Sequence, residues 1–163
     1  MVSVDAEAGQ AADTVVLKNI LKMWGRLMVS ARPGAIWVIN QEVEQQLFQM
    51  SLAVGTGGSS VYMPAGGVSQ SMFNTLMGKP VVVAEQAAGI GDTGDIILGD
   101  FGEYISIDKG GMKSDVSIHV QFLTDQVAFR FTYRIDGQPV LSQPITPAKG
   151  TLTQSHFVKL AAR

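Results

Sequence analysis

The sequence predicts an α+β fold in which a mixed sheet is flanked by helices. Two segments with helical periodicity enclose one apolar strand in the first third of the chain, and a series of short strands follows. Apolar residues make up 46% of the 163 residues. A chain of this size buries about 70% of the surface that its unfolded form exposes. We therefore expect one domain with a sizeable hydrophobic core.

Residues 1–12 are small, polar or Ala-rich, and we expect them to be a disordered lead-in. A helix follows, and Asp13 or Thr14 can cap it by accepting a hydrogen bond from a first-turn N–H group. Apolar residues then recur at the three- and four-residue steps of one helical face, at Val16, Ile20, Met23, Trp24 and Leu27. The Arg-Pro-Gly sequence at 32–34 is expected to end this helix.

A buried strand and a second helix are predicted next. Residues 35–39 form a continuous apolar run of strand-forming residues. Asn40 can cap a helix that we expect to extend to Leu52. The sequence Gly-Thr-Gly-Gly-Ser-Ser at 55–60 predicts a flexible loop, and residues 61–63 predict a short strand.

The middle of the chain alternates between strands and turns. Residues 73–83 predict a turn that leads into a strand, and residues 85–95 predict an exposed glycine-rich loop. Further strands are expected at 96–98 and 104–107, with a turn at 99–103 between them. The carboxylate of Asp100 can accept from amides of that turn, because Asp side chains commonly bond nearby backbone.

The last third has a period of two, which predicts long antiparallel strands with one buried face. The Asp-Lys-Gly-Gly sequence at 108–111 is a hairpin signal, and Asp136-Gly137 predicts another turn. A short strand is expected to begin at 140–141, and the tail at 149–163 to be ordered only by a neighbouring molecule. The alternating apolar positions are Val116, Ile118, Val120 and Phe122, then Val127, Phe129, Phe131 and Tyr133.

Composition excludes several classes of function. Charged residues amount to only 16%, against about 25% in an ordinary domain, which indicates a surface partly covered in use. The 12 basic and 14 acidic residues give a net charge of −2, so a general nucleic-acid footprint is absent. Without cysteine there are no disulfides, thiolate zinc sites or cysteine nucleophiles. The longest apolar run, at 81–84, is far below the roughly 20 residues of a membrane helix.

Asp92-Thr93-Gly94 matches the tripeptide of aspartic proteases. That chemistry needs a carboxylate at the end of an apolar strand and a second carboxylate to share its proton. Here the tripeptide lies in a glycine loop and occurs once, so only a homodimer could supply the pair. A surface turn is the favoured interpretation, and a homodimeric hydrolase that uses Asp92 is kept as an alternative of a different class.

Other motifs give weaker signals. The loop at 55–60 lacks the Lys of a phosphate loop. Five acids lie close together in the sequence without calcium-loop spacing, so no metal site is predicted: Asp92, Asp95, Asp100, Glu103 and Asp108. His119 and His156 have no nucleophile and acid near them in the sequence. No catalytic residue and no cofactor are predicted. A small ligand-binding or adaptor domain stays open if a deep apolar pocket exists.

Arg130 and Arg134 lie on the polar face of the last long strand, near Asp125 and Asp136. Guanidinium groups form bidentate pairs with carboxylates, within a chain or across an interface. Because Arg is enriched in interface cores and this chain carries few charges, we favour a subunit interface.

Four strings, in this order and spacing, resemble the major capsid protein family of tailed bacteriophages. They are Trp-Val-Ile-Asn at 37–40, Leu-Met-Gly-Lys-Pro-Val-Val-Val at 76–83, Leu-Gly-Asp-Phe-Gly-Glu-Tyr at 98–104, and the segment at 125–137 that ends Tyr-Arg-Ile-Asp-Gly. The resemblance spans residues 14–145 and covers only the C-terminal half of that family. It implies a fragment or remnant that lacks the arm, extended loop and spine helix.

The resemblance implies the phage capsid fold, with an axial-like domain at 13–115 and long strands at 116–148 that return to the peripheral domain. Turns that shape this fold are implied at Gly78, Pro80, Gly99, Asp100, Asp136 and Gly137. Residues implied to face neighbouring subunits are Gly55, Gly57, Ser59, Gly89, Asp92, Asp95, Asp125, Arg130 and Arg134. Some members join subunits by a Lys–Asn bond. Asp125 occupies the Asn position here, and the loop with the Lys is absent, so we expect no such cross-link.

The function implied by the resemblance is a structural one. Copies of the chain would assemble into hexamers and pentamers of an icosahedral shell around DNA, in the head of a phage or prophage, assembled in the bacterial host cytoplasm. The implied partners are copies of the chain itself and the scaffold, protease and portal proteins of the phage. No enzyme activity, specific nucleic acid or membrane is implied. Encapsulin shells share the fold, so an encapsulin-like shell subunit is the related alternative.

Overall fold

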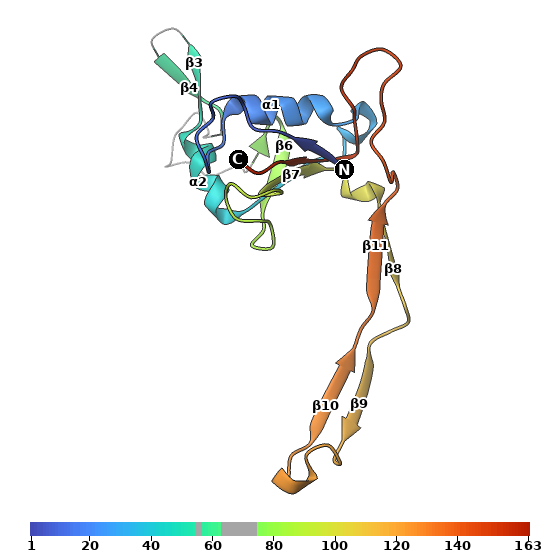
Figure 1. Ribbon diagram of the computed structural model, residues 1–163. Coiled ribbons are helices and arrows are strands. Elements are labelled where there is room, and N and C mark those ends of the chain that lie inside the picture. Colours follow the sequence, from blue (N-terminus) through green and yellow to red (C-terminus); the bar gives the residue numbers. More distant parts are fainter. Residues whose placement is uncertain (55–56, 63–74) are drawn as a thin grey trace. The chain divides into compact units, whose positions relative to one another are not determined.

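A computed structural model describes residues 1–54, 57–62 and 75–163 of the chain, which divide into two compact units (Figure 1). The first unit comprises Met1–Glu103 and Leu141–Arg163, and the second comprises Tyr104–Val140. The second unit is called the ribbon below. The predicted boundary at residue 115 therefore differs from the structural one, because the strand that begins at Tyr104 pairs within the ribbon.

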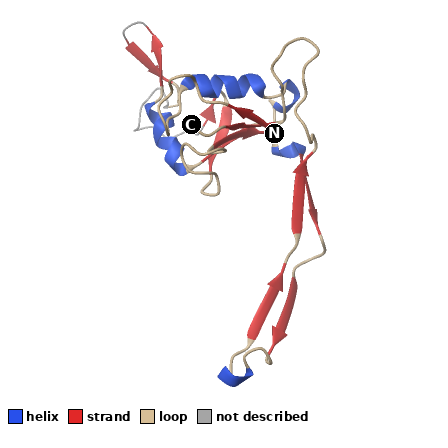
Figure 2. Ribbon diagram, viewed as in Figure 1, coloured by secondary structure: helices blue, strands red, loops and turns tan. Residues whose placement is uncertain are grey.

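A six-stranded mixed sheet is the centre of the first unit (Figure 2). In spatial order its strands are β1 (Val2–Val4), β12 (Phe157–Leu160), β7 (Ile96–Gly99), β2 (Ile36–Ile39), β6 (Lys79–Val83) and β5 (Thr75–Leu76). The β1–β12 and β2–β6 pairs are parallel and the others antiparallel. The predicted strands at 35–39 and 96–98 are confirmed as the adjacent central strands β2 and β7.

Both chain ends contribute strands to this sheet, which corrects two expectations. Residues 1–12 contain β1, whose Val2 and Val4 are each only 3% exposed, so the segment is not a disordered lead-in. Residues 149–163 contain β12, which pairs with β1 and β7 inside the same chain rather than needing a neighbour. Strands of three or four residues are too short for periodicity to reveal them.

Helix α1 lies over the sheet in Figure 1 and buries its apolar face there. The helical segments of the first unit are α1 (Leu17–Arg26), α2 (Gln41–Gln49) and the 3-10 turns Val29–Ala31 and Phe101–Glu103. The predicted caps of α1 at Asp13 and Thr14 are wrong. The Asn19 side chain accepts from the Val16 N–H at 3.0 Å instead and satisfies a first-turn donor.

The predicted cap of α2 is confirmed, because the Asn40 side chain accepts from the Glu42 N–H at 3.0 Å. The helix ends at Gln49 rather than at Leu52, since the chain then enters the hairpin of β3 (Ser51–Val54) and β4 (Gly57–Ser60). The predicted loop at 55–60 is therefore a strand over its last four residues, and 55–56 lie outside the described residues. Residues 61–62 form a bend rather than the strand predicted at 61–63, and residue 63 lies outside the described residues.

The predicted turn between β5 and β6 is confirmed at Met77 and Gly78, which have φ angles of 52° and 74°. Positive φ at both positions belongs to the tight hairpin turn that matches strand twist. Pro80 lies within β6 and not in the turn itself. After β7, the Asp100 carboxylate accepts from the Gly102 N–H at 3.0 Å, as expected for a turn-forming Asp.

The ribbon consists of two antiparallel strand pairs joined end to end. Its elements are β8 (Tyr104–Asp108), β9 (Lys113–Ser117), a 3-10 turn at Phe122–Thr124, β10 (Ala128–Thr132) and β11 (Ile135–Pro139). The pairs are β8 with β11 and β9 with β10. Neither pair contacts a second layer within the ribbon. No helix among the described residues is long and apolar enough to cross a membrane.

Three predicted turns and strands of this region are corrected. Residues 108–111 are a joint between β8 and β9 rather than a hairpin turn, because Lys109 donates its N–H to the Arg134 carbonyl across the ribbon at 2.9 Å. Asp136 and Gly137 lie inside β11 and not in a turn. The expected strand at 140–141 does not form.

Gly137 has a packing reason for being glycine. A Cβ there would lie 2.5 Å from the Tyr104 ring and 2.9 Å from the Ile105 carbonyl oxygen. Glycine is therefore required at this position because two strands approach closely there, and not because the backbone has a positive φ angle.

Candidate assembly surfaces

The β9–β10 pair has one polar face and one apolar face. Asp115 pairs with Arg130 across the strands, whereas Val116 pairs with Phe129 in the next register position. Side chains of successive residues point to opposite faces, so Val116, Phe129 and Phe131 share one face. They are 62%, 65% and 65% exposed. We call these three residues the apolar ribbon face.

The period-two alternation correctly predicts β9 and β10, but the face that was expected to be buried is exposed in this chain. The two strands have no second sheet or helix over them in the described structure of the ribbon. An isolated two-stranded pair is only marginally stable in water. Large exposed apolar patches occur at protein–protein contacts, membrane contacts and ligand-binding grooves.

The tip of the ribbon is also apolar and exposed. Leu123, in the 3-10 turn, is 98% exposed, and Val120 and Phe122 are 73% and 75% exposed. Asp125 ends this turn with a left-handed φ of 52°, a conformation that Asp adopts more readily than most residues. Its carboxylate is exposed, so its predicted role at a subunit interface stays a prediction.

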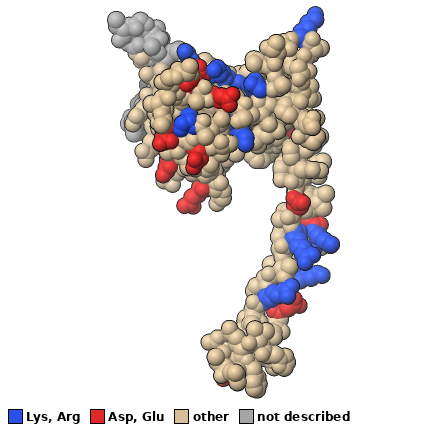
Figure 3. Space-filling view, in the orientation of Figure 1, with Lys and Arg blue, Asp and Glu red and all other residues tan. Residues whose placement is uncertain are grey.

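The polar face of the ribbon is hollowed into a groove of about 190 Å³. Most of its charged side chains are cationic, and we call it the basic groove. It is lined by Lys109, Gly111, Lys113, Asp115, Arg130, Thr132 and Arg134. Figure 3 shows the basic side chains gathered along the ribbon. Arg130 donates from Nε to Thr132 Oγ1 at 3.3 Å. Among the described residues no carboxylate lies within ion-pair distance of its four cations.

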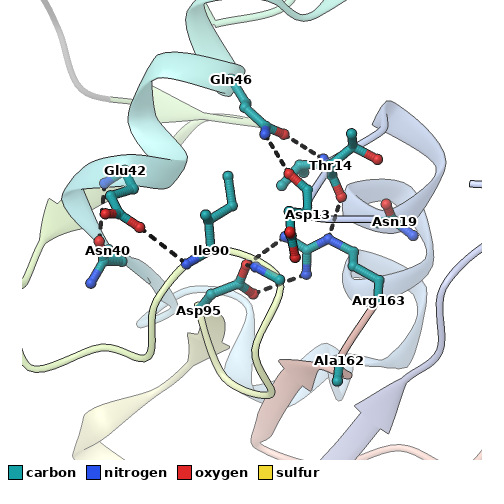
Figure 4. Close-up of polar contacts among 12 residues, drawn as sticks. Asp13, Thr14, Asn19, Asn40, Glu42, Gln46, Ile90, Asp95, Ala162 and Arg163 are labelled. Atoms are coloured by element: carbon teal, nitrogen blue, oxygen red, sulfur yellow. Dashed lines mark hydrogen bonds and ion pairs between the residues drawn. The ribbon is translucent and has the colours of Figure 1, made fainter. Parts of the chain in front are cut away.

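A buried ion pair fixes the loop at 85–95 in the first unit (Figure 4). Asp95 and Arg163 have side chains that are 0% and 1% exposed. Arg163 Nη1 donates to Asp95 Oδ1 at 3.1 Å, and Nη2 binds Oδ2. The Gly91 N–H also donates to Asp95 Oδ2 at 3.1 Å. The prediction that Asp95 faces a neighbouring subunit is therefore wrong, since its carboxylate is fully used inside the chain.

The same loop presents acids to solvent beside α2. A shallow depression of about 400 Å³ is lined by Asn40, Gln41, Glu42, Gln45, Glu85 and Gly89, and we call it the acidic depression. Glu42 Oε2 accepts from the Ile90 N–H at 3.4 Å, and Asn40 Nδ2 donates to the Ala87 carbonyl at 2.9 Å. These two bonds hold the loop against the start of α2.

Asp92 is exposed in a turn, where its N–H donates to the Gly89 carbonyl at 3.1 Å. It does not end an apolar strand, so it lacks the setting that the hydrolase alternative requires. Among the described residues no group of three His, Asp or Glu side chains is placed to hold a metal ion. Burial, and then Glu44, raises the pKa of Tyr62 to about 12, which stabilises the neutral phenol rather than a base.

His156 is nearly buried, although the sequence placed it in a polar tail. Its Nδ1 lies 3.7 Å from Glu103 Oε2. The apolar Phe157–Leu160 strand directly after it was the signal for burial. His119 lies near the tip of the ribbon and is exposed.

The ligand-binding alternative receives little support from the first unit. An open groove of about 500 Å³ there has apolar walls that include Val4, Leu21 and Leu152. The cations at its rim are already engaged, Lys22 with Glu7 and Arg26 with Thr153. Polar groups thus do not converge into it to orient a ligand.

The remaining predicted interface residues are distributed over both units. Gly55 lies outside the described residues, and Gly57 and Ser59 belong to β4. Gly89 and Asp92 are exposed in the first unit, and Arg130 and Arg134 in the ribbon. The structure does bring Arg130 and Arg134 together in one groove. The two lysines of that groove were not singled out, although their cross-strand positions relative to the arginines follow from the same alternation.

Solved structures show the same fold. The capsid of an empty GTA (gene transfer agent) particle, computed with C5 symmetry, matches at a TM-score of 0.67 and 19% identity, over 98% of this chain and 50% of that chain. The capsid of the native GTA particle matches at 0.69 and 18%, over 98% and 49%. This chain thus spans about half the length of those chains. No curated protein matches it.

These likenesses establish the capsid fold, an α+β fold with a mixed sheet, as the sequence resemblance implied. The model of the phage capsid family matches residues 1–150, which is most of the chain. The chain therefore belongs to the phage capsid family.

Proposed function

We propose that this chain is a structural protein, a major capsid subunit whose copies assemble into the hexamers and pentamers of an icosahedral, phage-like shell around DNA. The apolar ribbon face is the observation that carries the proposal. Three large side chains that are each more than 60% exposed have no use in an isolated molecule, but they suit a surface that tiles against another polypeptide.

Family membership supports the same conclusion and favours a phage-like shell over the encapsulin-like alternative, because the matching family model is that of phage capsids. In this proposal the first unit is the axial-like part, and the ribbon supplies strands of the peripheral domain. Gly89, Asp92, Asp125, Arg130 and Arg134 remain interface candidates because all five are exposed. Ring contacts would be heterologous, with different surfaces meeting in a head-to-tail arrangement.

The remaining expectations belong to the proposal as well. The chain would reside in the particle shell after assembly in the bacterial host cytoplasm, with scaffold, protease and portal proteins as further partners. It would act without enzyme activity. No Lys–Asn cross-link is expected at Asp125, so assembled particles should dissociate to single chains in hot detergent.

The test is assembly. The chain is produced alone and with an N-terminal extension that brings it to the length of the matching capsid chains, and the products are compared by sedimentation and electron microscopy. We expect rings or shells that Phe129→Asp with Phe131→Asp prevents, whereas Ser117→Asp, on the opposite face and outside the basic groove, interferes less. A failure of every wild-type form to give rings or shells at any salt concentration would overturn the proposal.

A further inference from the structure

We propose that the basic groove binds the acidic depression of a second copy of this chain. The inference rests on the proposed function, since it names two surfaces that meet when copies associate. It concerns the polar face of the ribbon, which lies opposite the apolar ribbon face and is therefore free when that face is covered.

The pairing of β9 with β10 fixes the positions of the cations that line the basic groove. Lys113 and Arg130 come from adjacent strands and lie on one face, because Lys113 pairs with Thr132 and Arg130 with Asp115. Lys109 and Arg134 continue the row across the joint, where a backbone hydrogen bond links them. Four cations thus line the groove against one carboxylate.

The acidic depression has the opposite sign and an equally fixed frame. If Gly89 carried a Cβ, that atom would lie 3.9 Å from Asp92 Oδ2 and 4.0 Å from Glu42 Oε2, so these two carboxylates flank the same spot. Glu85 lines the depression as well. Among the described residues no cation forms an ion pair with any of these three acids.

Charge complementarity favours a second copy as the occupant. The two surfaces have opposite sign and lie on different units of one chain, which suits a head-to-tail contact between identical molecules. The net charge of −2 gives no long-range attraction for nucleic acid. Exposed ion pairs contribute little singly, so a contact of this kind requires several together, as four cations facing three acids provide.

Site-specific cross-linking tests the contact directly. Because the sequence has no cysteine, copies carrying Thr132→Cys in the basic groove and copies carrying Gln45→Cys in the acidic depression can be mixed and oxidised. We expect a mixed disulfide at low salt whose yield falls as salt is raised. Ser114→Cys, on the opposite face of the ribbon, is the matched control and should give little product with Gln45→Cys.

Charge reversal then tests the cause. Lys113→Glu with Arg130→Glu should lower the yield about tenfold, because like charges would face each other. Adding Glu42→Lys and Glu85→Lys to the partner copy should restore it. Circular dichroism of each variant checks that the exposed substitutions leave the fold intact.

Three outcomes would overturn this inference. The first is an equal disulfide yield from Thr132→Cys and Ser114→Cys. The second is a disulfide yield that charge reversal leaves unchanged. The third is that charge-reversed copies no longer bind duplex DNA, as wild-type copies do, while the cross-link still forms. The last would assign the groove to nucleic-acid phosphates. If reversed copies still form shells without the cross-link, the inference fails and the proposed function stands. If wild-type chains form no shell at all, the proposed function fails.

Discussion

The two units of this chain use the same kinds of residue in opposite ways. In the first unit, Phe157 of β12 is 4% exposed and its ring meets that of Phe101 edge-on, with centroids 5.5 Å apart. In the ribbon, Phe129 of β10 is 65% exposed. Both lie in short strands with apolar neighbours. The difference teaches that apolar residues stabilise the interior of the first unit, whereas in the ribbon they stay exposed and, in the proposed function, are covered by other copies of the chain.

The most direct test of this difference between the two units is to make the same substitution in each of them. Phe157→Ala should lower the free energy of unfolding by about 3–5 kcal/mol, because it leaves a cavity in a packed region. Phe129→Ala should change it by less than about 0.5 kcal/mol. Urea unfolding of the unassembled chain followed by far-ultraviolet circular dichroism, which detects the strands of both units, measures both. Comparable losses would mean that the ribbon has a core of its own.

Removal of one partner of the buried ion pair should give the next effect. Arg163→Ala leaves the Asp95 carboxylate buried and unpaired, which costs about 3 kcal/mol or more. Asp92→Ala, in the same loop but exposed, is the control and should be nearly neutral. Chemical denaturation checks the pair of variants, and a loss below about 1 kcal/mol for Arg163→Ala would contradict the assignment of the loop anchor.

The ribbon can be perturbed without touching its apolar face. Gly137→Ala would place a Cβ within 3 Å of both the Tyr104 ring and the Ile105 carbonyl, so β8 and β11 must separate. We expect a local loss of about 1–3 kcal/mol. Hydrogen exchange should become faster at β8 and β11 while β2 and β7 stay unchanged. Unchanged hydrogen exchange at β8 and β11 in Gly137→Ala would show that the strands tolerate the extra atom.

A smaller effect is expected from pH. The raised pKa of Tyr62 means that the folded chain holds this proton more tightly than the unfolded chain. The resulting stability is present below about pH 10 and is lost as pH rises towards 12. Tyr62→Phe, which keeps the ring against Phe48, should flatten the pH dependence across this window. An unchanged slope in thermal melts would assign the dependence to other groups.

The sequence predicted elements whose signals are local. The apolar run at 35–39 and the Asn40 cap specify β2 and the start of α2 with neighbouring residues alone. The Met77-Gly78 turn likewise needs only its own backbone. By contrast, β1 and β12 were missed because each is short and stable only through a partner at the other end of the chain, as in the pairing of Val2 with Val158.

The candidate surfaces likewise divide into features with a local sequence signal and features that depend on residues far away in the sequence. Arg130 and Arg134 were found because strand alternation places polar residues on one face. Asp95 was misjudged because its glycine-rich surroundings suggest an exposed turn, whereas its partner, Arg163, is 68 residues away in the sequence. The exposure of the apolar ribbon face could not be predicted either, since alternation indicates that a face is covered but not whether the same molecule covers it.

The register that pairs Tyr104 with Pro139 has a practical consequence. This pairing brings together the two points at which the chain leaves and re-enters the first unit. Residues 104–140 are therefore arranged as an insertion in the first unit. A linker of a few residues from Glu103 to Leu141 should excise it and yield a miniature with the six-stranded sheet closed. Such a miniature would be a ready recipient for foreign hairpins displayed in place of the native one.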